Sequence, residues 1–200
     1  MDGKRRTIMD FRTLVESARS IRRFKQIPVS MTSLETLIDY ARISPCSANQ
    51  QRLKYMAVND QERMDLIFPL INWAGALKEW DGPVVGERPT AYIVILLDKD
   101  LGANAGVDHG IAAQTIQLGA RSMGLGACII GAYNRSNFSE TIGLPDTMEP
   151  LFIIALGEAG EEVMIDAHKS DGSIAYYRDA EDKHHVPKRP LEEVLWTGRG

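Results

Sequence analysis

Cysteine is scarce in this chain of 200 residues, and long apolar runs are missing. Cys46 and Cys128 lie far apart and form neither a Cys-x-x-Cys pair nor a zinc spacing, so we expect no disulfide scaffold and a reducing compartment. The longest apolar stretch, roughly 91–97, is much shorter than the ~20 residues of a membrane helix. Residues 1–11 are polar and basic, without the apolar core of a signal peptide. These absences favour a cytoplasmic protein with no membrane attachment.

The chain also lacks an excess of positive charge and the common motifs of metal and dinucleotide sites. Its formal net charge of −4 argues against nucleic-acid binding. Adjacent histidines at 184–185 point to different sides, and no His-x-Glu or His-x3-His spacing is present, so no metal site is expected. Gly124-x-Gly126 follows a helical stretch and opens a strand, which is the reverse of a Rossmann fingerprint.

Helical and strand patterns are interleaved through residue 156. Apolar spacing, caps and glycine stops predict helices over 10–19, 34–43, 104–123 and 135–142. Apolar and β-branched runs predict strands over 54–58, 90–97, 127–130 and 151–156. Asp10 is expected to cap the first helix, and Thr32 with Glu35 to form a capping box at the second. We interpret residues 1–200 as one α+β domain, a sandwich in which helices flank a mostly antiparallel mixed sheet.

The last segment, 157–200, differs from the rest of the chain. It is charged and has little helical or strand period, which predicts an extended C-terminal tail. The apolar residues near its end are Leu191, Val194, Leu195 and Trp196. They indicate that the tail docks, either on its own domain or on a partner subunit. Lys188-Arg189-Pro190 just before them is, on its own, most often a solvated basic patch.

The segment 19–23, Arg-Ser-Ile-Arg-Arg, combines positive charge with a hydroxyl. Alternate residues of an extended segment point the same way, so Ser20 and Arg22 are expected to share one face. A hydroxyl beside a guanidinium suits a phosphate group, because arginine offers a fork of charged donors. On charge alone, however, a solvated basic turn is favoured over a phosphate site.

Three further segments have side chains or backbone that a ligand can use. Residues 44–51, Ser-Pro-Cys-Ser-Ala-Asn-Gln-Gln, either bond the edges of a cofactor or form an ordinary polar loop. Gly131-Ala132 ends a strand without large side chains, which lets a ligand approach the backbone. The loop 80–89 contains Trp80, several charged residues and several glycines and prolines, and we interpret it as a lid that selects substrates.

Together these segments resemble the nitroreductase family of flavoproteins. Residues 19–24 are similar to the family's Arg-Ser-Ile-Arg-x-Phe opening, and 44–51 to its Pro-Ser-x-x-Asn-x-Gln loop. Residues 108–126 and 129–132 match its central helix and the strand that follows, and 188–194 match its C-terminal ending. The motifs occur in the family's order and span about 10–196. Ala18 and Arg52-Leu53 depart from the pattern, where a second arginine and Pro-Trp are common.

The resemblance implies an intertwined homodimer with two FMN molecules at its interface, and a tail that docks on the partner. The residues that it assigns to the cofactor are Arg19, Ser20, Ile21 and Arg22 at its phosphate, ribityl or ring-carbonyl end, Pro45, Cys46, Ser47 and Asn49 along the flavin, Ile129, Ile130 and Gly131 near the reactive N5, and Lys188 and Arg189 returning to the phosphate.

The activity implied by the resemblance is two-electron reduction of nitroaromatic, quinone or similar small acceptors by NAD(P)H, in a ping-pong cycle. The flavin carries the chemistry, so no side chain is assigned as nucleophile or base. Alternatives on the same scaffold are reductive dehalogenation and flavin fragmentation. Alternatives from other classes are a flavin-binding or sensing protein without efficient turnover, and a structural α+β domain without a cofactor.

Overall fold

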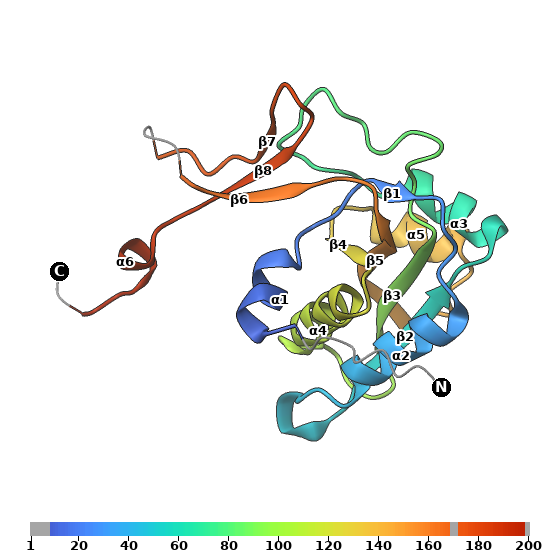
Figure 1. Cartoon of the computed structure of the whole chain (residues 1–200). Helices are drawn as coiled ribbons and strands as arrows, with labels where there is room; N and C mark the ends of the chain where they lie inside the picture. Colours follow the sequence, from blue (N-terminus) through green and yellow to red (C-terminus); the bar gives the residue numbers. More distant parts are fainter. Residues whose placement is uncertain (1–8, 169–171, 199–200) are drawn as a thin grey trace, which may run out of the picture.

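A five-stranded sheet forms the centre of the computed structural model, which describes residues 9–168 and 172–198 (Figure 1). Strand β3 (Ala91–Asp98) pairs with β2 (Leu53–Val58) on one side and with β5 (Met148–Ala159) on the other. The far edge of β5 pairs with β1 (Phe24–Lys25) and with β4 (Gly126–Ile130) along different stretches. All these strand pairs are antiparallel, which confirms the predicted α+β class and the mostly antiparallel sheet.

Both faces of this sheet are buried, which explains why β3 is apolar along its whole length. Tyr92 and Val94 point into one apolar cluster, and Ile93 and Ile95 point into a second cluster on the opposite face. The helices are α1 (Phe11–Ser17), α2 (Met31–Arg42), α3 (Gln61–Ile67), α4 (Asp108–Ser122), α5 (Arg135–Thr141) and α6 (Leu191–Val194), with short 3-10 turns at η1 (Ser47–Asn49) and η2 (Phe68–Leu70). Helices α2 and α4 cover the second face, whereas α3, η2 and α5 cover the first.

The small residues of α4 allow the close helix packing that the sequence predicts. A Cβ atom on Gly119 would lie 2.8 Å from Cδ2 of Tyr40 and 3.0 Å from Cδ2 of Leu37, both on α2. Only a residue without a side chain fits between these two helices. The helix begins at Asp108 and not at 104, because Gly106 turns the chain with a φ of +51°.

The helix caps were predicted with mixed success. Asp10 caps α1 as expected, accepting a hydrogen bond from the Thr13 N–H. The predicted capping box of Thr32 and Glu35 is wrong. Ser30 is the cap, and its Oγ accepts from the Ser33 N–H at 3.1 Å, so α2 begins at residue 31. Ser30 and Thr32 both carry a hydroxyl that can cap a helix. Ser30 is the cap because its backbone is extended, as a capping residue requires.

The expectation that 157–200 has little strand structure is wrong. The tail forms a second sheet in the order β6 (Val163–Ala167), β8 (His184–Lys188), β7 (Tyr177–Arg178). It then leads away from the body of the molecule to α6 (Figure 1). This sheet depends on parallel pairing of the short strand β6 with β8, which contains histidines, a lysine and a proline, so local periodicity does not reveal it.

No helix in the described ranges is both long and apolar enough to cross a membrane. The predicted lack of a signal sequence concerns residues 1–11, of which 1–8 lie outside the part that the structure describes.

Candidate functional site

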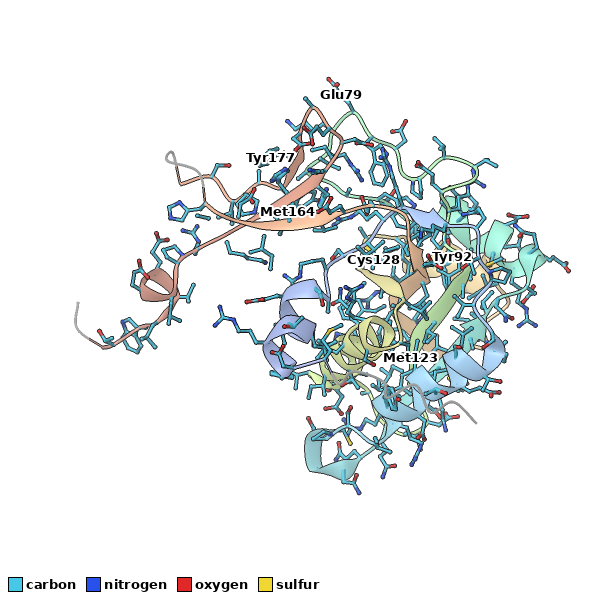
Figure 2. The ribbon with its side chains drawn as sticks, in the orientation of Figure 1. Glu79, Tyr92, Met123, Cys128, Met164 and Tyr177 are labelled. Atoms are coloured by element: carbon cyan, nitrogen blue, oxygen red, sulfur yellow. The ribbon has the colours of Figure 1, made fainter. Side chains whose placement is uncertain are left out.

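A pocket of about 150 Å³ lies at the end of β4. Segments that are far apart in the sequence meet there. The lining residues are the predicted cofactor residues Arg22, Ile129, Ile130 and Gly131, the loop residues Asn72, Trp73, Ala74 and Gly75, and Cys128, Ala132 and Tyr176. Cys128, labelled in Figure 2, belongs to β4 of the central sheet. The structure therefore joins two of the four predicted cofactor segments, and adds the loop 72–75 and the tail to them, whereas no residue of the predicted lid 80–89 is among the lining residues.

The backbone at the end of β4 is exposed and firmly held. The Asn72 N–H donates to the Ala132 carbonyl at 2.9 Å, which attaches the neighbouring loop to the strand end. Gly131 is exposed, as a ligand contact requires. Packing also explains this glycine, because a Cβ atom there would lie 3.0 Å from Cε1 of Phe152.

Arg22 brings a positive charge to this pocket. Its Nη1 lies 3.2 Å from Nε2 of His184 and 3.4 Å from the Ser20 carbonyl oxygen. The guanidinium also lies 5.0 Å from the centre of the Tyr176 ring. None of these side-chain partners in the described residues is a carboxylate, so the charge of Arg22 is available to an anionic ligand.

The other residues of the basic segment lie elsewhere. Arg19 and Ile21 line a separate small hollow beside α1 and α4, away from the pocket that contains Arg22. Ile21 is buried against Gly126, where a Cβ atom would lie 2.9 Å from three Ile21 carbons. Ser20 forms a parallel bridge to β4. In one chain, therefore, only Arg22 of this segment reaches the pocket.

The loop 44–51 borders a different groove, of about 330 Å³. Pro45 and Cys46 line it together with the cations Arg42, Arg52 and Lys54. No residue lines both this groove and the pocket at the end of β4. The predicted flavin contacts at 45–49 are thus not brought to Arg22 within a single chain.

Strained backbone and one buried carboxylate shape this loop. Ala48, Asn49 and Gln51 have positive φ values of 49°, 53° and 48°. Non-glycine residues rarely adopt this conformation, and it is typical of functional loops. Asp108, which is 3% exposed at the start of α4, accepts hydrogen bonds from the N–H and the Oγ of Ser47, both at 2.9 Å.

Lys188 and Arg189 lie at the far end of β8 and are exposed. Arg189 Nη1 pairs with Glu193 at 3.1 Å, and the Lys188 carbonyl accepts from the His168 N–H at 3.0 Å. Their described contacts therefore remain within the tail, and their predicted return to the cofactor phosphate stays a prediction.

Sequence reasoning missed four residues at these sites. Asn72, Trp73 and Tyr176 reach the pocket only through the folding of the loop 72–75 and of the tail, so no local pattern marks them. Asp108 stood inside a recognised motif without an assigned role. Its acidic side chain at the start of a helix was the signal that could have identified it.

Burial makes the thiol of Cys128 unreactive. It raises the pKa of this cysteine to about 11, so the thiol remains protonated at neutral pH and is a poor nucleophile. In the described part of the chain, no group of three or more His, Cys, Asp or Glu side chains is placed to hold a metal ion.

The fold is α+β with a pocket at the end of β4, and comparison with known proteins identifies the family. The nitroreductase family model matches residues 15–158. A solved nitroreductase family protein from Clostridium difficile 630 superposes with a TM-score of 0.67 at 20% identity, covering 96% of this chain and 100% of that one. The chain belongs to the nitroreductase family.

Two sequence relatives are similar over most of this chain. A protein of Methanothermobacter thermautotrophicus, provisionally named NADH dehydrogenase/NAD(P)H nitroreductase, is 29% identical over 168 residues, which are 80% of this chain and 83% of that protein. The NADPH-flavin oxidoreductase of Vibrio harveyi is 28% identical over 156 residues, which are 70% of this chain. The match spans 61% of the length of the Vibrio protein.

Proposed function

We propose that this chain is an FMN-dependent oxidoreductase that uses NAD(P)H to reduce nitroaromatic, quinone or similar small acceptors. The pocket at the end of β4 is the observation that carries the proposal, because Arg22 lines it together with the buried Ile130 and the exposed Gly131. Membership of the nitroreductase family supports a flavin. The name of the Vibrio relative supports both a flavin and a nicotinamide donor.

The residues of the pocket fit the polar edge of a flavin ring. A flavin is flat and apolar, with carbonyl and N–H groups along one edge, and Trp73 and Ile130 provide apolar walls. The Nε1 edge of the Trp73 indole packs against Gly82, where a Cβ atom would lie 2.6 Å from Cδ1 and 3.2 Å from Nε1 of Trp73. Arg22 adds positive charge and Asn72 adds an amide.

A homodimer would bring the two separated sites together. In one chain the loop 44–51 and the pocket at the end of β4 lie apart, although the resemblance assigns both to one flavin. The chain also exposes large apolar side chains on several elements, including Phe11 at 72%, Val107 at 68% and Trp196 at 87%. A partner chain would cover such side chains.

When bound, FMN supplies hydride exchange with NAD(P)H and with the acceptor. The chain supplies position and electrostatics. Arg22 stabilises negative charge in the pocket, and the backbone N–H groups of Ile130 and Gly131 orient the bound ring. Donor and acceptor bind in turn at the same face, which gives ping-pong kinetics. The loop 72–75 and Tyr176 border the pocket, and the lid 80–89 follows this loop, so together they limit the access of water and substrates.

The absorbance spectrum of the purified protein, followed by anaerobic titration with NADH and with NADPH, tests this proposal. We expect a bound flavin that either donor bleaches, and recovery of its colour on addition of a nitroaromatic or a quinone. A colourless protein that takes up no FMN overturns the proposal. Recovery with halogenated phenols alone favours dehalogenation, and recovery no faster than that of free flavin favours a flavin-binding protein without turnover.

A further inference from the structure

We propose that His184 of the tail positions the guanidinium of Arg22 for the anionic part of a bound flavin while leaving its positive charge uncancelled. The inference rests on the proposed function. It makes His184, and with it the tail sheet, part of the support of the cofactor pocket.

The contact between Arg22 and His184 determines the state of the histidine. A guanidinium has only donors, so Nε2 of His184, 3.2 Å from Nη1 of Arg22, must accept the hydrogen bond. The ring is therefore neutral and its proton is on Nδ1. Burial, together with the charge of Arg22, lowers the pKa of His184 to about 4, which agrees with this assignment. The side chain is 0% exposed, so its position is set by packing.

Because the hydrogen-bond acceptor for Arg22 is a neutral imidazole, Arg22 keeps its positive charge. A carboxylate would hold Arg22 more strongly, but it would also neutralise the charge that an anionic ligand needs. The nearest buried carboxylate, Glu161, is instead paired with Arg178 at 2.6 Å and accepts from the backbone N–H groups of Arg22 and Arg23. Glu161 thus ties the tail to the basic segment without forming an ion pair with Arg22.

Tyr176 holds Arg22 from a second side and connects it to the loop that precedes the lid. Its ring lies 5.0 Å from the Arg22 guanidinium and 5.4 Å from the His184 ring. Its hydroxyl accepts a hydrogen bond from the Ala76 N–H at 3.1 Å. The tail therefore fixes both the arginine and this loop through neighbouring contacts.

The next residue on β8 provides a matched control. His185 faces the other side of the tail sheet, where it stacks on Tyr177 (labelled in Figure 2) at 4.8 Å and lies within 3.0 Å of Asp166 and Asp179. A substitution at His185 changes the same strand and the same residue type. It does not touch Arg22.

The test compares His184→Gln, His184→Glu, His184→Leu and His185→Gln by FMN titration and by the midpoint potential of the bound flavin. Glutamine is a neutral acceptor, so His184→Gln should keep the FMN affinity within about twofold of the wild type and the midpoint potential within about 10 mV. Glutamate cancels the charge of Arg22, so His184→Glu should weaken FMN binding at least about tenfold or lower the potential by at least about 30 mV. His185→Gln should match the wild type.

His184→Leu keeps the test decisive if His184→Glu does not fold. It removes the acceptor without adding charge, and it should weaken FMN binding where His184→Gln does not. If the wild type binds FMN and all His184 variants have the same FMN affinity and midpoint potential as the wild type, this inference is overturned but the proposed function is not. Equal loss in His184→Gln and His184→Leu shows a merely structural role and also overturns it. Wild-type protein that binds no FMN overturns the proposed function as well.

Discussion

Replacing Gly126 with alanine tests whether Ile21 is a packing residue that sets the position of Arg22. The new Cβ would lie 2.9 Å from Cβ, Cγ1 and Cγ2 of Ile21. Carbon atoms pack best at roughly 3.5–4.0 Å, so the two chain segments must separate by about 0.6 Å or more. Ile21 is only 7% exposed, which leaves its side chain little room to rotate away. Overpacking of this kind costs about 1–3 kcal/mol.

Urea unfolding measures this cost, with the midpoint and slope fitted separately. We expect Gly126→Ala to lower the free energy of unfolding by about 1–3 kcal/mol and to weaken FMN binding, because Arg22 follows Ile21 directly. Gly75→Ala is the control, since nothing lies within 4 Å of its added Cβ, and it should change stability by less than about 0.5 kcal/mol.

A double mutant separates the clash from other effects of the new methyl group. Ile21→Ala removes two of the three clashing carbons, Cγ1 and Cγ2, and should cost about 2–5 kcal/mol alone, as is usual for this substitution. Combined with Gly126→Ala, it should cost less than the sum of the two single changes. Additive costs, or a Gly126→Ala protein as stable as the wild type, would refute the packing role of Ile21.

Three further predictions concern the tail, the lid and the strained loop. Hydrogen bonds from the ring of His185 to the carboxylates of Asp179 and Asp166 raise the pKa of His185 above 6.5, so its contribution to stability is complete below that pH and is lost as the pH rises through the folded-state pKa. Limited proteolysis should therefore cut the tail faster at high pH, and an unchanged rate would contradict this. The Trp80 ring lies 5.9 Å from the guanidinium of Arg23 and 5.3 Å from that of Arg178. Trp80→Ala removes these cation–π contacts, so it should release the lid and change kcat/KM by different factors for different acceptors. The same change in kcat/KM for every acceptor would refute substrate selection by the lid. Asp108→Ala should lower the free energy of unfolding by about 1–3 kcal/mol, because the Ser47 N–H and hydroxyl lose their acceptor. Asp108→Asn keeps an acceptor oxygen and should lower it less. Equal urea midpoints for the two variants would contradict this prediction.

Local sequence signals predicted the core of the fold well and the tail poorly. Strand β3 is apolar from Ala91 to Leu97, and α4 buries small residues such as Ala112, Ala113 and Gly119, so periodicity and residue size identify them. The tail sheet depends on pairing between β6 and β8, which lie apart in the sequence, and β8 carries polar side chains and a proline. Its stability comes from long-range contacts such as Glu161 with Arg178, which no local window contains.

By itself, the sequence determined the fold class, the family motifs in their order and the cofactor type to be tested. It could do so because these features reside in local patterns of apolar spacing, glycine and charge. Only the tertiary structure decided that Arg22 and not Arg19 reaches the pocket at the end of β4, and that Ile21 packs on Gly126. It also brought His184 and Tyr176 to Arg22 across more than 150 residues of sequence. The physical reason is that burial and hydrogen bonding between distant segments, and not the residue types alone, determine where a charge lies and whether it remains uncancelled.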